Sequence, residues 1–555
     1  MKKKMPFRIA ISLVLAQCLL FVPASVAQLP VCEEDDREIE CDADGFCISE
    51  IFLELEPGVS IETIELTYGV TLSDSLPELN FYLVTVETQP GEDAEEVVNV
   101  LVDDMGNDPG IKRAEPHRRM DTPEGVQLSI PDLGIQADPQ DFENQPAANT
   151  VRTVPAHGRY TGAGITVAVV DTGMAFDHPL TSDRILGPGA DFAGGDGTGQ
   201  AQPNCLDEDM DGVPDESLHH GTFVAGLVHL VAPDAKILPV RALETDGQGA
   251  TFDVARAILY AVEAGADVIN LSDTMLHEAR SIEKAIESAL NAGVVIVAAA
   301  GNRGQRIVED LGEGCKSFPA YRDEVIAVAA VDANLVKTDF SDYGTGVDLS
   351  APGVDLLSTY GVPLACDVMN GEPDAVDFAA WSGTSFAAPL VAGAAALILE
   401  KYPCLVPDQV RALLMQTAQP DNNPPELAGL MGAGVLDLDA LTSALTDDRC
   451  SLKASSTPGG TVLSWSPVLN ASTYDLARGE IANLEVVAEQ VNLGPLTCIA
   501  DDLTATDTAV VPDGELPPAG QAFFYLFRDN APDSDYGVDS SGQTRVPGGT
   551  DCATP

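Results

Sequence analysis

Three short stretches of the sequence place an acid, an imidazole and a hydroxyl where each could react. Asp171 follows the apolar run VAVV, His220 begins the stretch HGTFVAG, and Ser385 lies among small residues in WSGTSFAAPLVAG. A serine hydroxyl becomes a nucleophile when a base takes its proton, and a carboxylate can hold a histidine base in the required tautomer. These residues are candidates for a nucleophilic triad in which Ser385 attacks, His220 is general base and then acid, and Asp171 orients the imidazole.

Among the other histidines, His219 lacks the Gly-Thr that follows His220. We interpret His229 as a helix-face residue and His277 as a surface residue.

The elements that must position these groups occupy the middle of the chain. Apolar strands are predicted at GITVAVV, AKILPV, DVINLS, VVIVAAA and EVIAVAAV, and they alternate with helical segments such as TFDVARAILYAVEAG and SIEKAIESALNAG. Nearly continuous apolar strands separated by helices indicate a parallel sheet covered on both faces. Reactive groups in such sheets gather at the carboxyl ends of the strands.

The chain resembles the subtilisin-like serine proteases, or subtilases. The stretches VAVVDTG, HGTFVAG and GTSFAAPLVAG resemble the three signature blocks of that family, and they occur in its order of Asp, His and Ser. The resemblance extends from about residue 149 to 445. It implies an α/β subtilisin-like fold in residues 151–445 and a serine-type endopeptidase that cuts peptide bonds through an acyl-enzyme. It also assigns the triad to the three residues above and the oxyanion amide to Asn302, which follows the apolar run VVIVAAAG. The amide N–H of Asn302 and the backbone N–H of Ser385, at the start of a predicted helix, could bind the negative oxygen of a tetrahedral intermediate.

The resemblance further implies where extended substrates bind. The stretch TDGQGA resembles the segment that pairs with substrate, and its Gly247 and Gly249 would let a substrate backbone come close. Ser272 and Asp273 are also expected to bind substrate. Asp273 and Thr274 lie where small residues usually line the first specificity pocket, so Asp273 would favour basic side chains or narrow that pocket. Phe223 occupies a position where many subtilases have a second histidine.

An acidic loop between Asp171 and His220 is a candidate calcium site. The stretch DEDMDGVPDE has acids at alternating positions and a glycine at the sixth, which suits calcium. It is not a complete EF-hand, and a solvated acidic loop is the alternative interpretation. The expected ligands of this structural Ca²⁺ are Asp207, Asp209, Asp211 and Asp215. No organic cofactor is expected.

The regions on either side of the catalytic domain have a different texture. Residues 28–50 form an acidic, cysteine-containing stub, and residues 51–119 alternate strands and helices and resemble a subtilase propeptide. Residues 120–150 look like a linker, with self-cleavage expected between 119 and about 148; an α+β domain that stays attached is the alternative. Residues 446–555 are expected to form a small all-β domain, loosely similar to fibronectin type III through Trp465, Ala471 and Tyr474.

The composition and the first residues indicate an exported acidic protein. The 87 acidic and 29 basic residues give a net charge of −58, which argues against nucleic acid as a partner. Residues 1–27 have the cationic start, apolar run and small-residue end of a signal peptide, so no membrane span is expected after processing. Oxidising conditions would allow disulfides. Cys18 lies within this peptide. The cysteines that follow it are Cys32, Cys41, Cys47, Cys205, Cys315, Cys366, Cys404, Cys450, Cys498 and Cys552.

Together these observations predict a secreted, monomeric, self-processing protease. Its expected partners are protein or peptide substrates and its own propeptide. The alternative from a different class is a catalytically silent, calcium-stabilised surface or adhesive protein on a subtilase scaffold.

Overall fold

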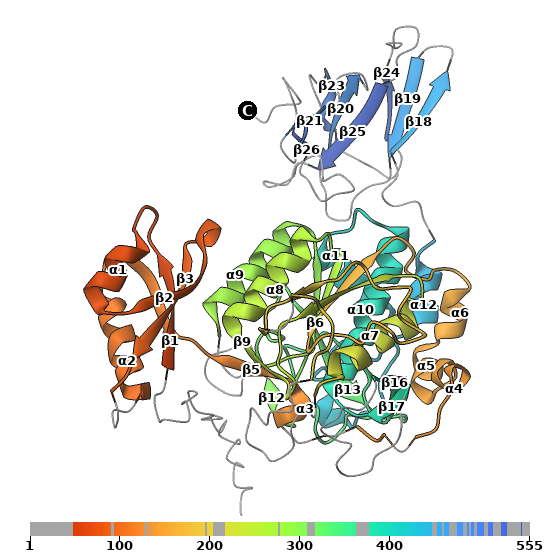
Figure 1. Cartoon of the computed structure of the whole chain (residues 1–555). Helices are drawn as coiled ribbons and strands as arrows, with labels where there is room; N and C mark the ends of the chain where they lie inside the picture. Colours follow the sequence, from red (N-terminus) through yellow and green to blue (C-terminus); the bar gives the residue numbers. More distant parts are fainter. Residues whose placement is uncertain are drawn as a thin grey trace, which may run out of the picture.

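The computed structural model describes residues 48–89, 94–126, 129, 131–133, 135–194, 197–203, 217–275, 278–307, 317–361 and 377–446, together with the C-terminal strands given below. The N-terminal unit, the central α/β domain and the C-terminal strands can be followed along the colour gradient in Figure 1.

The N-terminal unit is an antiparallel sheet with two helices, as the alternating pattern predicts. Its strand order is β2-β3-β1-β4. The elements are β1 (Ile48–Leu55), α1 (Ile61–Tyr68), β2 (Thr71–Leu76), η1 (Pro77–Leu79), β3 (Phe81–Glu87), α2 (Ala94–Met105) and β4 (Ile111–Pro116). Strand β2 has the polar sequence TLSDSL and its side chains are only partly buried or exposed, so no apolar alternation marks it as a strand.

The central domain is built on a seven-stranded sheet of order β15-β13-β11-β10-β6-β8-β7, in which every pair of neighbours is parallel. Its strands are β6 (Thr166–Asp171), β7 (Ala190–Asp191), β8 (Lys236–Arg241), β10 (Val268–Leu271), β11 (Val295–Ala299), β13 (Ile326–Val331) and β15 (Leu349–Pro352). The five apolar strands predicted from the sequence are all present, and the parallel α/β fold is confirmed.

Helices cover both faces of this sheet, because alternate strand residues point to opposite sides. In β6, Val167 and Val169 belong to the core beneath α7 and α10, while Ala168 and Val170 belong to the core beneath α8 and α9. The helices of this domain are α7 (His220–Val231), α8 (Thr251–Glu263), α9 (Arg280–Asn291), α10 (Thr384–Lys401), α11 (Pro407–Thr417) and α12 (Leu438–Ala444).

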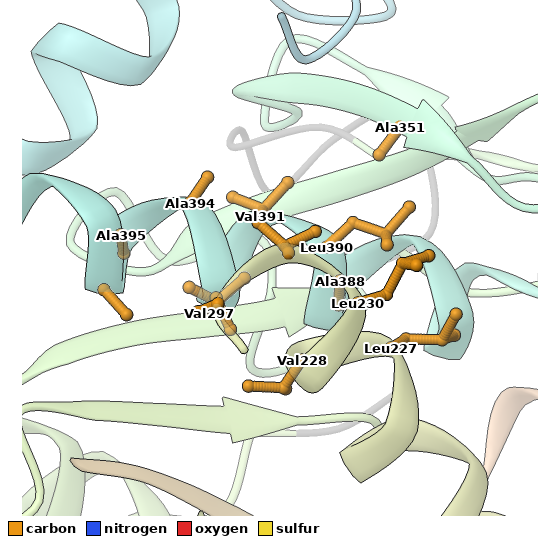
Figure 2. Packing of buried hydrophobic residues seen from close by; sticks show 14 of the residues in the cluster. Leu227, Val228, Leu230, Val297, Ala351, Ala388, Leu390, Val391, Ala394 and Ala395 are labelled. Carbon is orange, nitrogen blue, oxygen red and sulfur yellow. The ribbon is translucent and has the colours of Figure 1, made fainter. Parts of the chain in front are cut away.

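Helix α10 fills the larger of these two cores. Its residues from Thr384 to Leu399 are all buried, and Figure 2 shows Ala388, Leu390 and Val391 packed among side chains of α7 and the sheet. Small residues along α10 allow this close approach; a Cβ at Gly393 would lie 2.7 Å from the Cβ of Val231. Among the described helices, α10 is the one long and apolar enough to cross a membrane, and its burial inside the fold identifies it as a core helix.

The segment expected to be a linker is structured and packs on the central domain. It holds β5 (Arg119–Asp121), α3 (Pro123–Val126), α4 (Pro139–Glu143) and most of α5 (Pro146–Val151); α6 (Thr153–His157) follows it, within the range predicted for the catalytic domain. The linker prediction is wrong for these residues, because helices this short show no periodicity yet bury Phe142, Ala147, Ala148 and Val151 in the central core.

The remaining elements are short strands at the edges of the domain and the C-terminal strands. The former are β9 (Gln248–Ala250), β12 (Arg306–Ile307), β14 (Tyr343–Gly344), β16 (Leu356–Thr359) and β17 (Phe378–Trp381), with the 3-10 turn η3 (Pro425–Leu427). The latter are β18 (Leu452–Thr457), β19 (Gly460–Trp465), β20 (Tyr474–Glu480), β21 (Glu485–Val487), β22 (Gln490–Asn492), β23 (Thr497–Leu503), β24 (Ala509–Asp513), β25 (Phe523–Asp529) and β26 (Arg545–Val546). These strands agree with an all-β region; the likeness to fibronectin type III stays a prediction, since Ala471 lies outside the described residues.

Candidate active site

Asp171 and His220 form a buried pair at the carboxyl end of β6. Asp171 is the last residue of β6 and His220 the first of α7. Nδ1 of His220 lies 2.8 Å from Oδ1 and 3.0 Å from Oδ2 of Asp171, and the backbone N–H of Thr172 donates to Oδ1 at 2.7 Å. Glycine follows His220 for a steric reason, because a Cβ at Gly221 would lie 2.2 Å from the carbonyl oxygen of Gly173. The carboxylate therefore fixes the ring with Nε2 facing the site.

Ser385 lies in the first turn of α10, where backbone N–H groups have no partner within the helix. Its hydroxyl donates to Oε2 of Glu124 at 2.6 Å and lies 3.2 Å from the carbonyl oxygen of Ser272. Among the hydrogen bonds of the described residues, none joins Ser385 directly to His220. Instead, Oε2 of Glu124 lies between them, 3.2 Å from Nε2 of His220.

Asn302 presents its amide N–H to the same point. Its Oδ1 accepts from both the backbone N–H and the hydroxyl of Thr384, each at 2.9 Å, so its Nδ2 must face the other way. Nδ2 donates to Oε1 of Glu124 at 2.8 Å. Ser385, His220 and Asn302 thus converge on one carboxylate, although 261 residues separate Glu124 from Ser385 in the sequence.

The two carboxylates set the charge of the imidazole. Burial lowers the pKa of His220, but the charge and hydrogen bond of Asp171, followed by those of Glu124, outweigh it and raise this pKa to about 10. With Glu124 in place, His220 is therefore an imidazolium at neutral pH.

An aromatic cluster backs the imidazole. The ring centroid of His220 lies 5.1 Å from that of Phe386 and 5.5 Å from that of Trp381. Phe223 packs against both, with centroids 4.6 Å from Phe386 and 5.8 Å from Trp381. Phe223 is thus a core residue behind the site, at the position where a second histidine is common in the family that the chain resembles.

A short strand of the chain itself lies along the predicted substrate-binding segment. β5 pairs antiparallel with β9, with Met120 opposite Gly249, and the N–H of Thr122 donates to the carbonyl of Gly247 at 2.9 Å. Gly247 has a φ of +86°, and a Cβ there would lie 2.5 Å from Oγ1 of Thr122. A Cβ at Gly249 would instead meet Cδ2 of Leu243 at 2.3 Å. Gly247 therefore leaves room for the extended backbone beside it, whereas Gly249 is required by the packing of the domain itself.

Ser272 and Asp273 follow β10 (Val268–Leu271), and Ser272 contacts Ser385. The hydroxyl of Ser272 donates to the carbonyl oxygen of Ser385 at 2.9 Å, which ties the start of α10 to the sheet. Asp273 is fully buried, and neither of its carboxylate oxygens has a hydrogen-bond partner among the described residues. Burial, and then the charge of Asp171, raise the pKa of Asp273 to about 7. Its preference for basic substrate side chains stays a prediction.

The structure describes neither the predicted calcium loop nor His277. Asp207, Asp209, Asp211 and Asp215 lie outside the described residues. Within the described part of the chain, no cluster of three or more His, Cys, Asp or Glu side chains could hold a metal ion.

His219 and His229, two further histidines of the central domain, have surroundings of their own. His219 packs edge-on against Tyr360, with ring centroids 4.9 Å apart. His229 lies on α7, and its burial lowers its pKa to about 4, so it is neutral.

The comparisons with known proteins decide the family. The subtilase family model matches residues 162–434. Subtilisin DY of Bacillus licheniformis is 35% identical over 274 residues, which are 48% of this chain and 87% of that protein. Subtilisin BL of Lederbergia lenta is 35% identical over 302 residues, which are 53% of this chain and 96% of that protein. The chain belongs to the subtilase family. It is a serine-type endopeptidase, a hydrolase that acts on proteins.

A solved structure also aligns with this subtilase. It is a protease from Pseudoalteromonas arctica PAMC 21717, with 29% identity, a TM-score of 0.48, and coverage of 56% of this chain and 99% of that chain.

Sequence reasoning missed two residues at this site. Glu124 lay in a segment interpreted as linker, and no local pattern marks an acid that acts on residues so distant. Thr384 precedes the serine within its signature block, and its hydroxyl was not recognised as the group that orients Asn302.

Proposed function

We propose that this subtilase cuts peptide bonds with Ser385 as nucleophile, His220 as general base and acid, Asp171 as the orienting carboxylate and Asn302 as oxyanion donor. The observation that carries this proposal is the convergence of three groups on one point. Oγ of Ser385, Nε2 of His220 and Nδ2 of Asn302 all lie within 3.2 Å of a single carboxylate. A reacting carbonyl must be close to nucleophile, base and oxyanion donor at once.

In the mature enzyme the steps follow from these positions. Oγ of Ser385 attacks the carbonyl carbon while its proton passes to Nε2 of His220, and Asp171 stabilises the imidazolium. The oxygen that gains negative charge accepts from Nδ2 of Asn302 and from the backbone N–H of Ser385. His220 then gives the proton to the leaving amine. Water repeats the sequence on the acyl-enzyme and releases the new carboxylic acid.

The proposal includes synthesis as a zymogen whose N-terminal unit is a propeptide. Support comes from how that unit packs on the central domain. The rings of Phe52 and Phe252 on α8 are 6.3 Å apart, and Nε of Arg280 on α9 donates to Oε2 of Glu54 at 3.0 Å. β5 then continues this unit alongside β9, with which it pairs. Cleavage between residue 119 and about 148 would leave the short helices α4 to α6 with the enzyme.

Export, disulfides and calcium complete the proposal. Export rests on the signal-like residues 1–27, and the mature enzyme would act outside the cell as a monomer without a membrane span. Disulfide formation is supported by Cys404, which is disulfide-bonded. Bound calcium would be held by the acidic loop from Asp207 to Asp215.

The test compares the secreted wild-type chain with Ser385→Ala, and uses Ser382→Ala as the matched control. Ser382 lies three residues before the nucleophile, and its hydroxyl accepts from the N–H of Asp355 at 2.9 Å. A fluorophosphonate probe should label wild type and Ser382→Ala and leave Ser385→Ala unlabelled. N-terminal sequencing should find mature ends in the two labelled proteins and an uncut propeptide in Ser385→Ala. Labelling of Ser385→Ala would contradict the assignment of the nucleophile. No labelling of wild type would contradict the proposal and favour the silent surface protein.

A further inference from the structure

The segment from β5 to Asp132 is hydrogen-bonded to the central domain on both sides of the active site. On one side, β5 pairs with β9 and the N–H of Thr122 donates to Gly247. On the other side, Nε1 of Trp381 donates to the carbonyl oxygen of Ser129 at 2.6 Å, and Asp132 pairs with Ala380. Glu124, which lies between these two anchors in the sequence, contacts Ser385.

Between these anchors the backbone turns instead of staying extended. α3 begins at Pro123, immediately after the last hydrogen bond to Gly247, and the carbonyl of Glu124 accepts from the N–H of Ser129 at 3.2 Å. The turn directs the side chain of Glu124 into the site, where it is 1% exposed. The acceptor that Nδ2 of Asn302 meets is therefore a side-chain carboxylate rather than a peptide carbonyl.

This carboxylate engages each group that the reaction needs. Oε2 accepts the proton of Ser385 that the base should take, and it also lies 3.2 Å from Nε2 of His220. Oε1 accepts the hydrogen bond from the Nδ2–H of Asn302. Because both nitrogens of His220 face carboxylates, the ring is held as an imidazolium and has no lone pair for the serine proton.

The space around the carboxylate is fitted to it. A Cβ at Gly383 would lie 1.6 Å from Oε1 of Glu124, so the missing side chain makes room for this oxygen. Nucleophile, base and oxyanion amide thus have a single shared occupant, which is anionic like the intermediate they would stabilise.

We propose that Glu124 is an inhibitory side chain that keeps the uncut precursor inactive by occupying the oxyanion site and holding Ser385 and His220 apart. This inference rests on the function proposed above and names the group that regulates the same site. The precursor can react only after the turn at α3 withdraws Glu124.

The experiment follows labelling of the precursor during maturation. The full chain is refolded from denaturant, samples are exposed briefly to a fluorophosphonate probe, and precursor and mature bands are resolved on a gel. Glu124→Gln keeps the shape of the side chain without its charge, and Glu124→Ala removes the contacts altogether. The matched control is Glu54→Gln, which removes a charge between the N-terminal unit and Arg280 away from the site.

Three results are expected. The wild-type precursor band should label at least about tenfold more slowly than the mature band, since charge-assisted hydrogen bonds must first break. The Glu124→Gln and Glu124→Ala precursors should label at nearly the mature rate. The Glu54→Gln precursor should behave like wild type.

Two results would overturn this inference alone: equal labelling of the wild-type precursor and mature bands, or acceleration by Glu54→Gln as large as that by Glu124→Ala. The second would mean that looser docking, and not loss of the carboxylate, exposes Ser385. Failure of every mature band to label would overturn the proposed function, and the inhibitory role with it.

A second measurement leaves Glu124 unchanged, in case its variants do not fold. NMR of the imidazole nitrogens in the full Ser385→Ala chain reports the protonation of His220 directly. Two bound protons at about pH 8, well above the ordinary histidine pKa, are expected. A neutral ring at that pH would contradict the arrangement.

Discussion

Oδ1 of Asn302 accepts two hydrogen bonds from Thr384, one from its backbone N–H and one from its hydroxyl, both at 2.9 Å. Oγ1 of Thr384 also accepts from the N–H of Gly301 at 3.1 Å. The amide is thereby locked with its N–H groups toward Ser385 before any substrate arrives. Such preorganisation is what makes a hydrogen-bond donor effective against charge that develops during reaction.

Asn302→Ala should therefore lower kcat of the mature enzyme by about 10²–10³, the loss known for removing such a donor from a related subtilisin and not a value obtained from this structure. KM should change little, because the donor acts on the intermediate. Steady-state kinetics on a chromogenic peptide will check this. A change confined to KM would show that Asn302 binds the ground state.

Thr384→Val should act through Asn302. It removes the hydroxyl while keeping the shape, so we expect kcat to fall about tenfold with KM and the pH profile unchanged. Thr384→Ser restores the hydroxyl and should restore kcat. If Val and Ser variants lose activity equally, packing of the methyl group rather than orientation of Asn302 is responsible.

Asp273→Asn should change how stability depends on pH. The folded-state pKa of Asp273 is raised to about 7, so the native chain holds a proton that the unfolded chain releases above about pH 4. The stability linked to Asp273 is therefore fully present below about pH 4 and is lost as pH rises toward about 7. In a Ser385→Ala background, we compare the free energy of unfolding of Asp273→Asn with that of its parent. The difference should shift in favour of the variant by about 2–3 kcal/mol between about pH 5 and pH 8.

Denaturant unfolding at several pH values will measure this difference. Asp342 is also buried with a pKa raised to about 7, so wild-type stability falls over the same range for more than one reason, and only the variant-to-wild-type difference isolates Asp273. Asp183→Asn, at a side chain that is 70% exposed, is the control and should show no such trend. A pH-independent difference for Asp273→Asn would mean that its carboxyl is ionised in the folded state.

Alanine variants of Gly247 and Gly249, which lie beside β5, should differ in their effects on peptide binding and on stability. Gly249→Ala places a methyl group against Leu243 and should cost about 1–3 kcal/mol of unfolding free energy through overpacking. Gly247→Ala crowds Thr122 and Ser217 and strains a positive φ, so it should also raise KM for peptides bound along β9. Melting curves and peptide kinetics on both variants will distinguish them; an equal rise in KM would contradict the assignment.

Calcium removal provides a test of the acidic loop. If Asp207, Asp209, Asp211 and Asp215 hold Ca²⁺, chelation should lower the melting temperature of the wild-type chain, because a ligand bound only by the folded state stabilises it. Asp209→Asn combined with Asp211→Asn should lower it similarly and abolish the response to chelator. An unchanged response in that variant would place any calcium elsewhere.

The sequence was sufficient for the central fold and for the reacting groups because both are encoded locally. Apolar runs such as the one before Asp171 make buried strands, and the residue that ends each strand must lie at the same edge of a parallel sheet. Glu124 could not be found this way, since its role depends on a turn at Pro123 and on anchors at Thr122 and Ser129 that only the folded chain brings together. β2 escaped notice because a polar edge strand lacks the alternation that marks a buried one.

Because β5 and α3 belong to the same chain as the site they cover, the group that occupies that site cannot be diluted. A tethered group experiences an effective concentration of roughly millimolar or more, however few molecules are present. Once the chain is severed, the same group competes only at its bulk concentration. Release into a large volume would then favour the open enzyme without any further signal, whereas crowding at the site of synthesis would favour the closed one.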